Sequence, residues 1–357
     1  MLTQEQVREI KNYLERVGNP LFFFDNDVDG LCSFLLLARY IGRGKGVSIK
    51  SFPDLNVSYS RKLYELNPDS VFVLDKPIIS EGFLKEIDKL NLPLIWIDHH
   101  DVENKVVREV GGKLESSDFI PSTLKYYNPN KEFNRNHPVT YLSWQINQKK
   151  EDIWLALAGC IGDNYLPDFL EDFKALYPDL IKGKTKSAFE ILYETEIGKI
   201  TRIMNFALKD RTSNVVRMIK YLLQIKDPRE ILNESPKNHM LFRYNQVNRK
   251  YQKLIERARN FDKEKVLYFQ YGGDLSLSGD IANELSYRYP HKIIIVAYIK
   301  GTKANISLRG ENIREIAEKI IKNFEDATAG GHKNAAGGKL NVEDLPKFKE
   351  RIEKLVS

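Results

Sequence analysis

An acid and two imidazoles stand together after a short apolar run in the first third of the chain. Asp98, His99 and His100 follow Pro93 and residues 94–97, which have the pattern of a buried strand. Open α/β sheets place their ligand sites at the carboxyl ends of such strands. Polar groups that are costly to bury seldom stand beside a core strand without a partner. The tripeptide is therefore a candidate site, although an ordinary polar loop would have the same composition.

Three more carboxylates end a second apolar run. Asp25, Asp27 and Asp29 occupy alternate positions after residues 21–24, and Gly30 and an apolar, helix-like run follow them. At a strand end such side chains can converge on one point, where they repel one another unless a cation lies among them. An Asp-rich turn is the alternative interpretation, because Asp-Gly is a common turn pair.

Two single aspartates extend the set. Asp75 ends the apolar residues 71–74, and Asp163 follows Gly162 after the apolar, helix-like residues 154–161. Taken alone, each also fits an ordinary strand end or helix C-terminus. Carboxylates with a few imidazoles suit manganese or magnesium, and the absence of cysteine argues against a structural zinc site. Two cations that share one carboxylate need about seven protein ligands, roughly what this set supplies.

The order of these motifs resembles the DHH phosphoesterase superfamily. Along the chain they run Asp-x-Asp-x-Asp-Gly, strand-Asp, Asp-His-His and Gly-Asp, and the variant at residues 25–30 is similar to the RecJ-type nucleases. Many other DHH enzymes have a histidine at the position of Phe23. In the RecJ group an aspartate at the position of Asp25 takes its place as ligand.

This resemblance implies a role for each residue of the set. One cation would be held by Asp25, Asp27 and Asp75. The other would be held by Asp29, Asp75, His99 and Asp163, so that Asp75 bridges the two. The catalytic residues Asp98 and His100 would orient a ligand or face the phosphate. The expected cofactors are two divalent cations, Mn²⁺ first, with Mg²⁺ or Co²⁺ as alternatives.

A glycine-rich stretch near the C-terminus carries a second match. Residues 329–338 are similar to the Gly-Gly-Gly-His-x-x-Ala-Ala-Gly pattern of the DHH-associated domain, with Ala329 in place of the first glycine. As a loop, they would bring backbone N–H groups and an imidazole to an anion. Arg309, after the predicted strand 304–308, resembles the substrate-binding arginine of that domain, whose planar fork would hold a phosphate. The resemblance thus implies a set of substrate-binding residues: Arg309, Gly330, Gly331, His332 and Ala335.

The composition is that of a soluble globular enzyme. A chain of 357 residues with 42% hydrophobic residues should form two or more domains around sizeable cores. No apolar run is long enough to span a bilayer, and residues 1–17 have the pattern of a charged amphipathic helix, not of a signal peptide. Cys32 and Cys160 lie in apolar helical runs, which predicts buried free thiols in a reducing, cytoplasmic compartment.

The elements that must position these residues follow an α/β pattern. Strands are predicted at residues 21–25, 47–52, 70–75, 93–98, 123–127, 266–270, 292–299 and 304–308. Helices are predicted at residues 138–148, 152–161, 189–208, 215–225, 243–261, 280–289, 313–324 and 345–355. We therefore expect a metal-binding DHH domain with a parallel sheet at 1–185, a helical connector at 186–262 and a smaller α/β, DHH-associated domain at 263–357. The active site would lie in the cleft between the two α/β domains.

Residues 236–265 form the most basic stretch of a chain whose net charge is only +6. They contain nine lysines and arginines against three acids, with Tyr244, Tyr251 and Phe261 interleaved. Such a helix could follow a phosphate backbone and stack bases. An ordinary solvated helix face, or a surface that docks a protein, fits the same pattern.

These features together predict a manganese-dependent, RecJ-like exonuclease. It would hydrolyse single-stranded DNA, RNA or both to mononucleotides through two cations. Single-stranded nucleic acid is the expected substrate and no membrane is involved. Archaeal members of this group join replication or repair complexes, which makes a replication or repair protein a further expected partner.

Two alternatives stay open. The first is a nanoRNase or 3′-phosphoadenosine 5′-phosphate phosphatase acting on short oligonucleotides, although these usually keep the histidine replaced by Phe23 and have a shorter connector. Inorganic pyrophosphatase uses that histidine as well. The second is a non-catalytic replication or repair scaffold, like the related replication-helicase subunit that has lost several ligands. In this chain every expected ligand is present.

Overall fold

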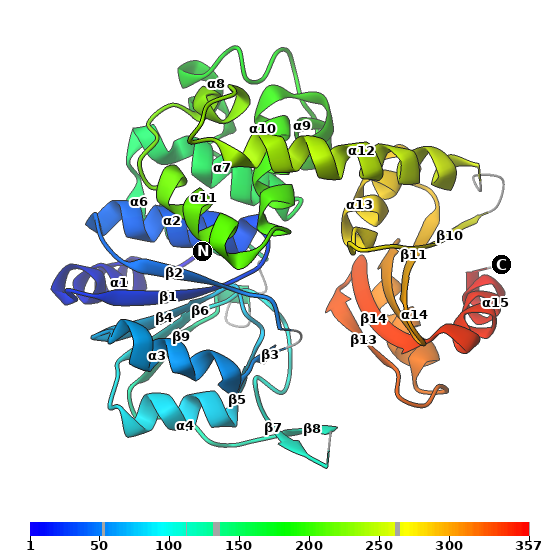
Figure 1. Ribbon diagram of the computed structural model, residues 1–357, viewed down its shortest axis with the longest axis horizontal. Helices are drawn as coiled ribbons and strands as arrows, with labels where there is room; N and C mark the ends of the chain where they lie inside the picture. Colours follow the sequence, from blue (N-terminus) through cyan, green and yellow to red (C-terminus); the bar gives the residue numbers. More distant parts are fainter. Residues whose placement is uncertain (52–53, 112, 131–135, 261–264, 357) are drawn as a thin grey trace. The chain divides into compact units, whose positions relative to one another are not determined.

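The computed structural model describes residues 1–51, 54–111, 113–130, 136–260 and 265–356, and its elements are labelled in Figure 1. The chain divides into two compact units, Met1–Tyr244 and Asn245–Ser357, and the boundary falls within helix α12 (His239–Arg259). Residues 52 and 261, at the ends of two predicted elements, lie outside the described residues. The predicted three-part division at residues 185 and 262 stays a prediction.

A five-stranded parallel sheet forms the centre of the first unit. Its strand order is β2-β1-β4-β6-β9, and every neighbouring pair is parallel, as predicted. The strands are β1 (Pro20–Asp25), β2 (Lys45–Ile49), β4 (Ser70–Leu74), β6 (Leu94–Ile97) and β9 (Leu124–Tyr127). Because the strands are parallel, their carboxyl ends meet at one edge of the sheet.

Helices cover both faces of this sheet, which explains why its three central strands, β1, β4 and β6, are apolar and buried over nearly their whole length (Figure 1). On one face Phe23 packs edge-on against Phe83. On the other face Phe24 stacks on Phe34, with ring centroids 5.2 Å apart. The first face carries α3 (Arg61–Leu66) and α4 (Glu81–Lys89). The second carries α2 (Val28–Ile41), with α6 (Val139–Asn147) and α7 (Ile153–Gly162) packed on it.

The remaining helices of the first unit depart from the prediction at two places: the helix at residues 170–176 was not predicted, and the one predicted at 189–208 is divided. They are α1 (Gln4–Arg16), α8 (Leu170–Leu176), α9 (Ala188–Glu194), α10 (Glu196–Leu208) and α11 (Thr212–Leu222). The single helix predicted at 189–208 is wrong, because Thr195 is extended and separates α9 from α10. Its side chain accepts a hydrogen bond from the Gly198 N–H, so it caps α10 instead of continuing α9.

A small second sheet in the first unit was not predicted. Its order is β3-β5-β7-β8, formed by β3 (Asp54–Leu55), β5 (Ile78–Ser80), β7 (Val106–Val110) and β8 (Lys113–Ser116). These strands have two to five residues, and β7 is exposed over its last three. Strands this short and this exposed carry little apolar pattern from which to predict them.

The second unit is a smaller α/β domain, as predicted. Its sheet has the order β10-β11-β12-β14-β13, in which only β10 and β11 are parallel. The strands are β10 (Val266–Gly272), β11 (Ile293–Lys300), β12 (Lys303–Arg309), β13 (Thr328–His332) and β14 (Ala335–Asn341). Three helices accompany them: α13 (Ser278–Arg288), α14 (Ile313–Ile321) and α15 (Leu345–Val356).

The glycine-rich stretch at 329–338 is not the predicted loop. It forms most of the hairpin β13–β14, in which only Lys333 and Asn334 lie between the strands. Glycine and alanine have low strand propensity, so the sequence favoured a loop. Pairing of β14 with β12 supplies the backbone hydrogen bonds that hold these residues in the sheet.

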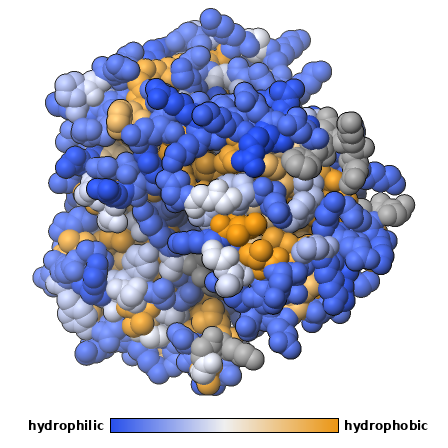
Figure 2. All heavy atoms as spheres, turned by 45° about the vertical axis from the view of Figure 1, so that its right-hand side comes forward, coloured by the Kyte–Doolittle hydropathy of each residue, from blue (hydrophilic) through white to orange (hydrophobic). Residues whose placement is uncertain are grey.

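Both cysteines are free and buried, as predicted, Cys32 on α2 and Cys160 on α7. Burial, and next the Asp29 carboxylate, raise the pKa of both thiols. Hydrophilic side chains cover most of the face drawn in Figure 2, with smaller hydrophobic areas between them. Among the described residues, no helix combines the length and the hydrophobicity needed to cross a membrane.

Candidate metal centre

The carboxyl edge of the parallel sheet collects most of the predicted ligands. Asp25 ends β1, Asp75 follows β4, and His99 lies two residues after β6. Ligand atoms of Asp29, Asp75 and His99 lie within 4.8 Å of one another, and the same holds for Asp75, Asp98 and His100. The structure therefore brings together residues that are 70 positions apart in the chain, Asp29 and His99.

Asp29 is held in place by the start of helix α6. Its two carboxylate oxygens accept hydrogen bonds from the backbone N–H groups of Val139 and Thr140, at 2.8 and 2.7 Å. A helix N-terminus favours a negative charge, so the buried Asp29 is kept in a fixed orientation. Gly30 allows α2 to begin this close to β1, since a Cβ at this position would lie 2.5 Å from the Asp25 carbonyl oxygen.

Asp75 occupies the middle of the cluster in a strained position. Its side chain is 2% exposed and its φ of 58° is in the left-handed region, which few non-glycine residues adopt. Its Oδ1 has no hydrogen-bond donor among the described residues. Burial, and then the charges of Asp29, Asp27 and Asp25, raise the pKa of Asp75 well above its usual value. A buried carboxylate oxygen of this kind is the donor a divalent cation would take.

His99 presents a ring nitrogen to the same point. Its Nε2 is 3.3 Å from Asp75 Oδ1 and 4.0 Å from Asp29 Oδ2, while its Nδ1 is 2.7 Å from Asn136 Oδ1. When Nδ1 donates to Asn136, the Nε2 lone pair faces two carboxylates, an arrangement that suits a shared cation. Burial alone would lower the pKa of His99, but the carboxylates of Asp163, Asp29 and Asp98 raise it.

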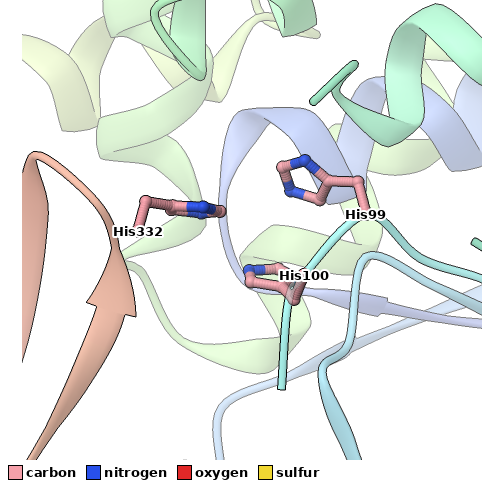
Figure 3. Close-up of side chains that lie close together, drawn as sticks. All are labelled: His99, His100 and His332. Atoms are coloured by element: carbon pink, nitrogen blue, oxygen red, sulfur yellow. The ribbon is translucent and has the colours of Figure 1, made fainter. Parts of the chain in front are cut away.

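Asp98 orients the second imidazole. It is fully buried, and its Oδ1 lies 2.8 Å from the Nδ1 of His100. Burial acts to raise the pKa of Asp98, but His100 and Lys105, whose Nζ is 3.5 Å away, lower it below the usual value. The rings of His99 and His100 lie close together at the end of β6, with centroids 4.5 Å apart (Figure 3).

Asp27 adds a further carboxylate whose ionisation is unfavourable. It caps helix α2, accepting a hydrogen bond from the Gly30 N–H at 2.9 Å. Burial raises the pKa of Asp27 to about 7, and the neighbouring charges of Asp25 and Asp29 act in the same direction. The cluster therefore holds more negative charge than its own side chains neutralise, which fits a site for divalent cations.

Asp25 and Asp163 lie at the rim, with side chains 28% and 31% exposed. Asp163 Oδ2 is 3.9 Å from the Nδ1 of His99. Asp25 instead pairs with Lys76, a buried lysine that sequence reasoning missed. In the sequence, a lysine between an aspartate and Pro77 has the pattern of a turn. Asn136 lies in an irregular segment, so no sequence pattern marked either residue as part of the site.

The predicted substrate-binding residues of the second unit meet at one end of its sheet. Ala335 on β14 is opposite Arg309 on β12 and opposite His332 on β13. Gly331 is paired with the next residue of β14, and Gly330 with the one after that. The Arg309 guanidinium donates to Asn283 Oδ1 at 2.6 Å and to the Leu308 carbonyl at 2.7 Å, which fixes its plane.

The structure supports only part of the interpretation of the basic stretch at residues 236–265. Tyr244 and Tyr251 are 6% and 2% exposed, so they pack inside the protein and cannot stack bases as predicted. Phe261 lies outside the described residues. On α12 several basic side chains remain exposed, namely Arg249, Lys250, Lys253, Arg257 and Arg259.

Comparison with known sequences assigns the C-terminal region to one family. Residues 263–357 match the profile of the DHHA1 domain. A search of curated protein sequences finds no match.

Comparison with solved structures extends the likeness to the whole chain. RecJ of Thermus thermophilus, in complex with Mn²⁺, matches 98% of this chain with a TM-score of 0.64 and 17% identity. This chain spans only 54% of that protein. An exonuclease RecJ bound to manganese matches 99% of this chain and 95% of its own, with a TM-score of 0.59 and 17% identity.

A third structure is the DHH domain of a member of a family of ribosomal proteins. It matches 99% of this chain and 89% of its own, with a TM-score of 0.65 and 13% identity. The parallel sheet with its aspartate-histidine edge and the matched C-terminal domain lead to one conclusion. The chain has the fold of the RecJ structures and of this DHH domain, and its C-terminal region matches the DHHA1 domain model.

Proposed function

We propose that this protein is a metal-dependent phosphodiesterase, a RecJ-like exonuclease that hydrolyses single-stranded DNA or RNA to mononucleotides. The observation that supports this most is the buried Oδ1 of Asp75, which has no donor among the described residues and faces the Nε2 of His99. The folds of manganese-bound RecJ structures support the same assignment. Asp29, Asp75, His99 and Asp163 would hold one cation, and Asp25, Asp27 and Asp75 the other.

The residues of the cluster have separable tasks in this proposal. Bound cations would supply positive charge to the attacked phosphate and lower the pKa of a water nucleophile. Asp29 stays in position through the N-terminus of α6, and His99 through Asn136. Asp98 orients His100, which is 22% exposed and therefore able to reach a substrate phosphate.

The second unit would bind the substrate. We assign residues 263–357 as the substrate-binding domain, 1–185 as the catalytic domain and 186–262 as the connector. Arg309 would hold a phosphate, because its guanidinium is already oriented by Asn283 and by the Leu308 carbonyl. His332 and the backbone of Gly330, Gly331 and Ala335 lie at the same end of the sheet and would complete the phosphate site.

Digestion of labelled substrates with Mn²⁺ tests the proposal. Single-stranded DNA and RNA, each labelled at either end, are incubated with the full chain beside a dinucleotide and a duplex. We expect stepwise release of mononucleotides from one end of the single strands and none from the duplex. Asp29→Asn should abolish this release, whereas Asp88→Asn, an exposed acid on α4, should leave it unchanged.

The other outcomes identify the alternatives. Hydrolysis of the dinucleotide alone would replace the proposal with an oligoribonuclease acting on short products. Equal activity of the wild type and Asp29→Asn would overturn the metal-site assignment. Absence of hydrolysis with Mn²⁺, Mg²⁺ and Co²⁺ would favour the non-catalytic scaffold.

A further inference from the structure

A buried lysine stands at one end of the carboxylate cluster. The side chain of Lys76 is 1% exposed, and its Nζ lies 3.0 Å from Asp25 Oδ1 and 2.9 Å from the Ser51 carbonyl oxygen. Ammonium groups are seldom buried to this degree unless they are paired. The protein thus places its own cation against one of the carboxylates proposed to bind a metal ion.

The backbone explains how two consecutive side chains reach the same cluster. In a regular strand, neighbouring side chains point to opposite faces. The left-handed conformation of Asp75 interrupts this alternation directly after β4, so the Asp75 carboxylate and the Lys76 ammonium both join the acids. The Lys76 carbonyl accepts a 2.8 Å hydrogen bond from the indole of buried Trp96, which holds this turn in place.

The opposite end of the cluster has no such cation. Among the described residues, no lysine or arginine forms an ion pair with Asp29 or Asp75. The carboxylates of Asp29 and Asp75 and the imidazole of His99 are therefore open to a metal ion, whereas Asp25 already has a positive partner. A metal ion at Asp25 would be repelled by this adjacent buried ammonium, and displacing the ammonium would take its carboxylate partner from Lys76 at a substantial cost.

We infer that Lys76 is an internal counter-cation that makes the two cation sites of the cluster unequal. The first cation binds tightly at Asp29, Asp75 and His99. The second binds weakly at Asp25, because it competes with the Lys76 ammonium. This inference rests on the proposed function only in assuming that the cluster binds divalent cations.

Direct titration of the full chain with Mn²⁺ tests the inference without reference to activity. Free Mn²⁺ is measured by electron paramagnetic resonance, and heats are measured by calorimetry. The wild type should show two binding events whose dissociation constants differ by roughly ten- to a hundredfold. Lys76→Met should tighten the weaker event by about tenfold or more and leave the tighter one within about threefold.

Two further variants separate competition from a general charge effect. Lys105→Met removes an equal charge beside Asp98, not beside Asp25, and should leave the ratio of the two dissociation constants within about twofold of the wild type. Asp25→Asn keeps Lys76 and should abolish the weak event while the tight event persists. This variant tests the inference even where Lys76→Met does not fold.

Several results would overturn the inference. Two equal sites in the wild type would do so, as would a weak event unchanged by Lys76→Met, or loss of the tight event in Asp25→Asn. Each of these leaves the metal-dependent function intact. Absence of Mn²⁺ binding in every form of the protein would overturn the proposed function together with the inference.

Discussion

The two candidate sites are built on different kinds of backbone. In the first unit, carboxylates are buried beside one another, Asp75 is left-handed, and the pKa values of Asp27 and Asp75 are raised. In the second unit, Arg309 and His332 are partly exposed on paired antiparallel strands. The metal-free first unit is thus destabilised by its own site, whereas the second unit is not. A substitution in the first site should therefore change both stability and activity. A substitution in the second site should change activity and leave stability nearly unaltered.

The largest effect is expected from Asp75→Asn. Hydrolysis should fall by about 10³-fold, since the proposed shared ligand of the cluster loses its charge. The metal-free protein should instead become more stable by about 1 kcal/mol, because one of several crowded buried charges is removed. Steady-state rates with Mn²⁺ and urea unfolding in a chelator measure the two quantities. Full hydrolysis by Asp75→Asn, or a loss of metal-free stability, would remove the contrast between the units.

The pH dependence of metal-free stability is the next largest effect. Because the pKa of Asp27 is raised to about 7 and that of Asp75 is also raised, the folded protein binds more protons than the unfolded chain from about pH 4 to 7. Stability should therefore fall as the pH rises through this window. The raised pKa of His99 acts in the same direction, since a charged imidazole stabilises the fold only until it deprotonates.

Saturating Mn²⁺ should reverse this trend, because the cation binds deprotonated ligands. Urea unfolding at pH 5 and pH 8, with chelator and with Mn²⁺, measures both slopes. A metal-free protein that gains stability between pH 5 and pH 8 would show that repulsion among these carboxylates does not destabilise the fold.

An intermediate effect is expected from Arg309→Lys in the second unit. A lysine cannot reproduce the planar fork, so KM for single-stranded substrate should rise roughly ten- to thirtyfold while kcat changes little. Stability should stay within about 0.5 kcal/mol of the wild type, since the side chain is partly exposed. Arg314→Lys, on the partly exposed pair with Glu318, is the matched control and should leave KM unchanged. A fall in kcat with constant KM would place Arg309 in the chemical step instead.

The smallest effect compares two adjacent glycines of β13. Gly331 has a φ of +136°, and an added Cβ would lie 2.5 Å from the Ala335 carbonyl oxygen, so Gly331→Ala should cost about 1–2 kcal/mol. Gly330 has no atom within 4 Å of such a Cβ, and Gly330→Ala should be nearly neutral. Thermal unfolding of both variants measures the difference. Equal melting temperatures would show that the hairpin is not constrained as described.

The fold was predictable wherever apolar runs were long enough to show a period. The parallel sheet followed from runs such as residues 21–25 and 70–75, which are buried on both faces. The strands β13 and β14 were not predictable, because their glycines favour a loop and only the pairing of β14 with β12 and of β13 with β14 makes them strands. Helix α9 ends where the Thr195 hydroxyl caps the next helix, a local competition that apolar spacing does not record.

The candidate site was predictable in its residue types and less so in its contacts. The order of aspartates and histidines at strand ends led to the cluster, since parallel strands must bring their carboxyl ends together. The hydrogen bonds from Val139 and Thr140 to Asp29 span 110 and 111 positions and have no local signal. The same is true of Lys76, whose role depends on the backbone conformation of the residue before it.

The reactivity of the two buried thiols, Cys32 and Cys160, reports local opening of the first unit. They are the only cysteines of the chain, both lie in that unit, and burial suppresses their ionisation. A thiol reagent can react with them only when α2 or α7 transiently separates from its neighbours. The rate of modification of the unaltered protein therefore records how often these helices separate from their neighbours. Divalent cations that bind Asp27 and Asp29 at the start of α2 should lower this rate of thiol modification. The second unit contains no cysteine and contributes nothing to the rate.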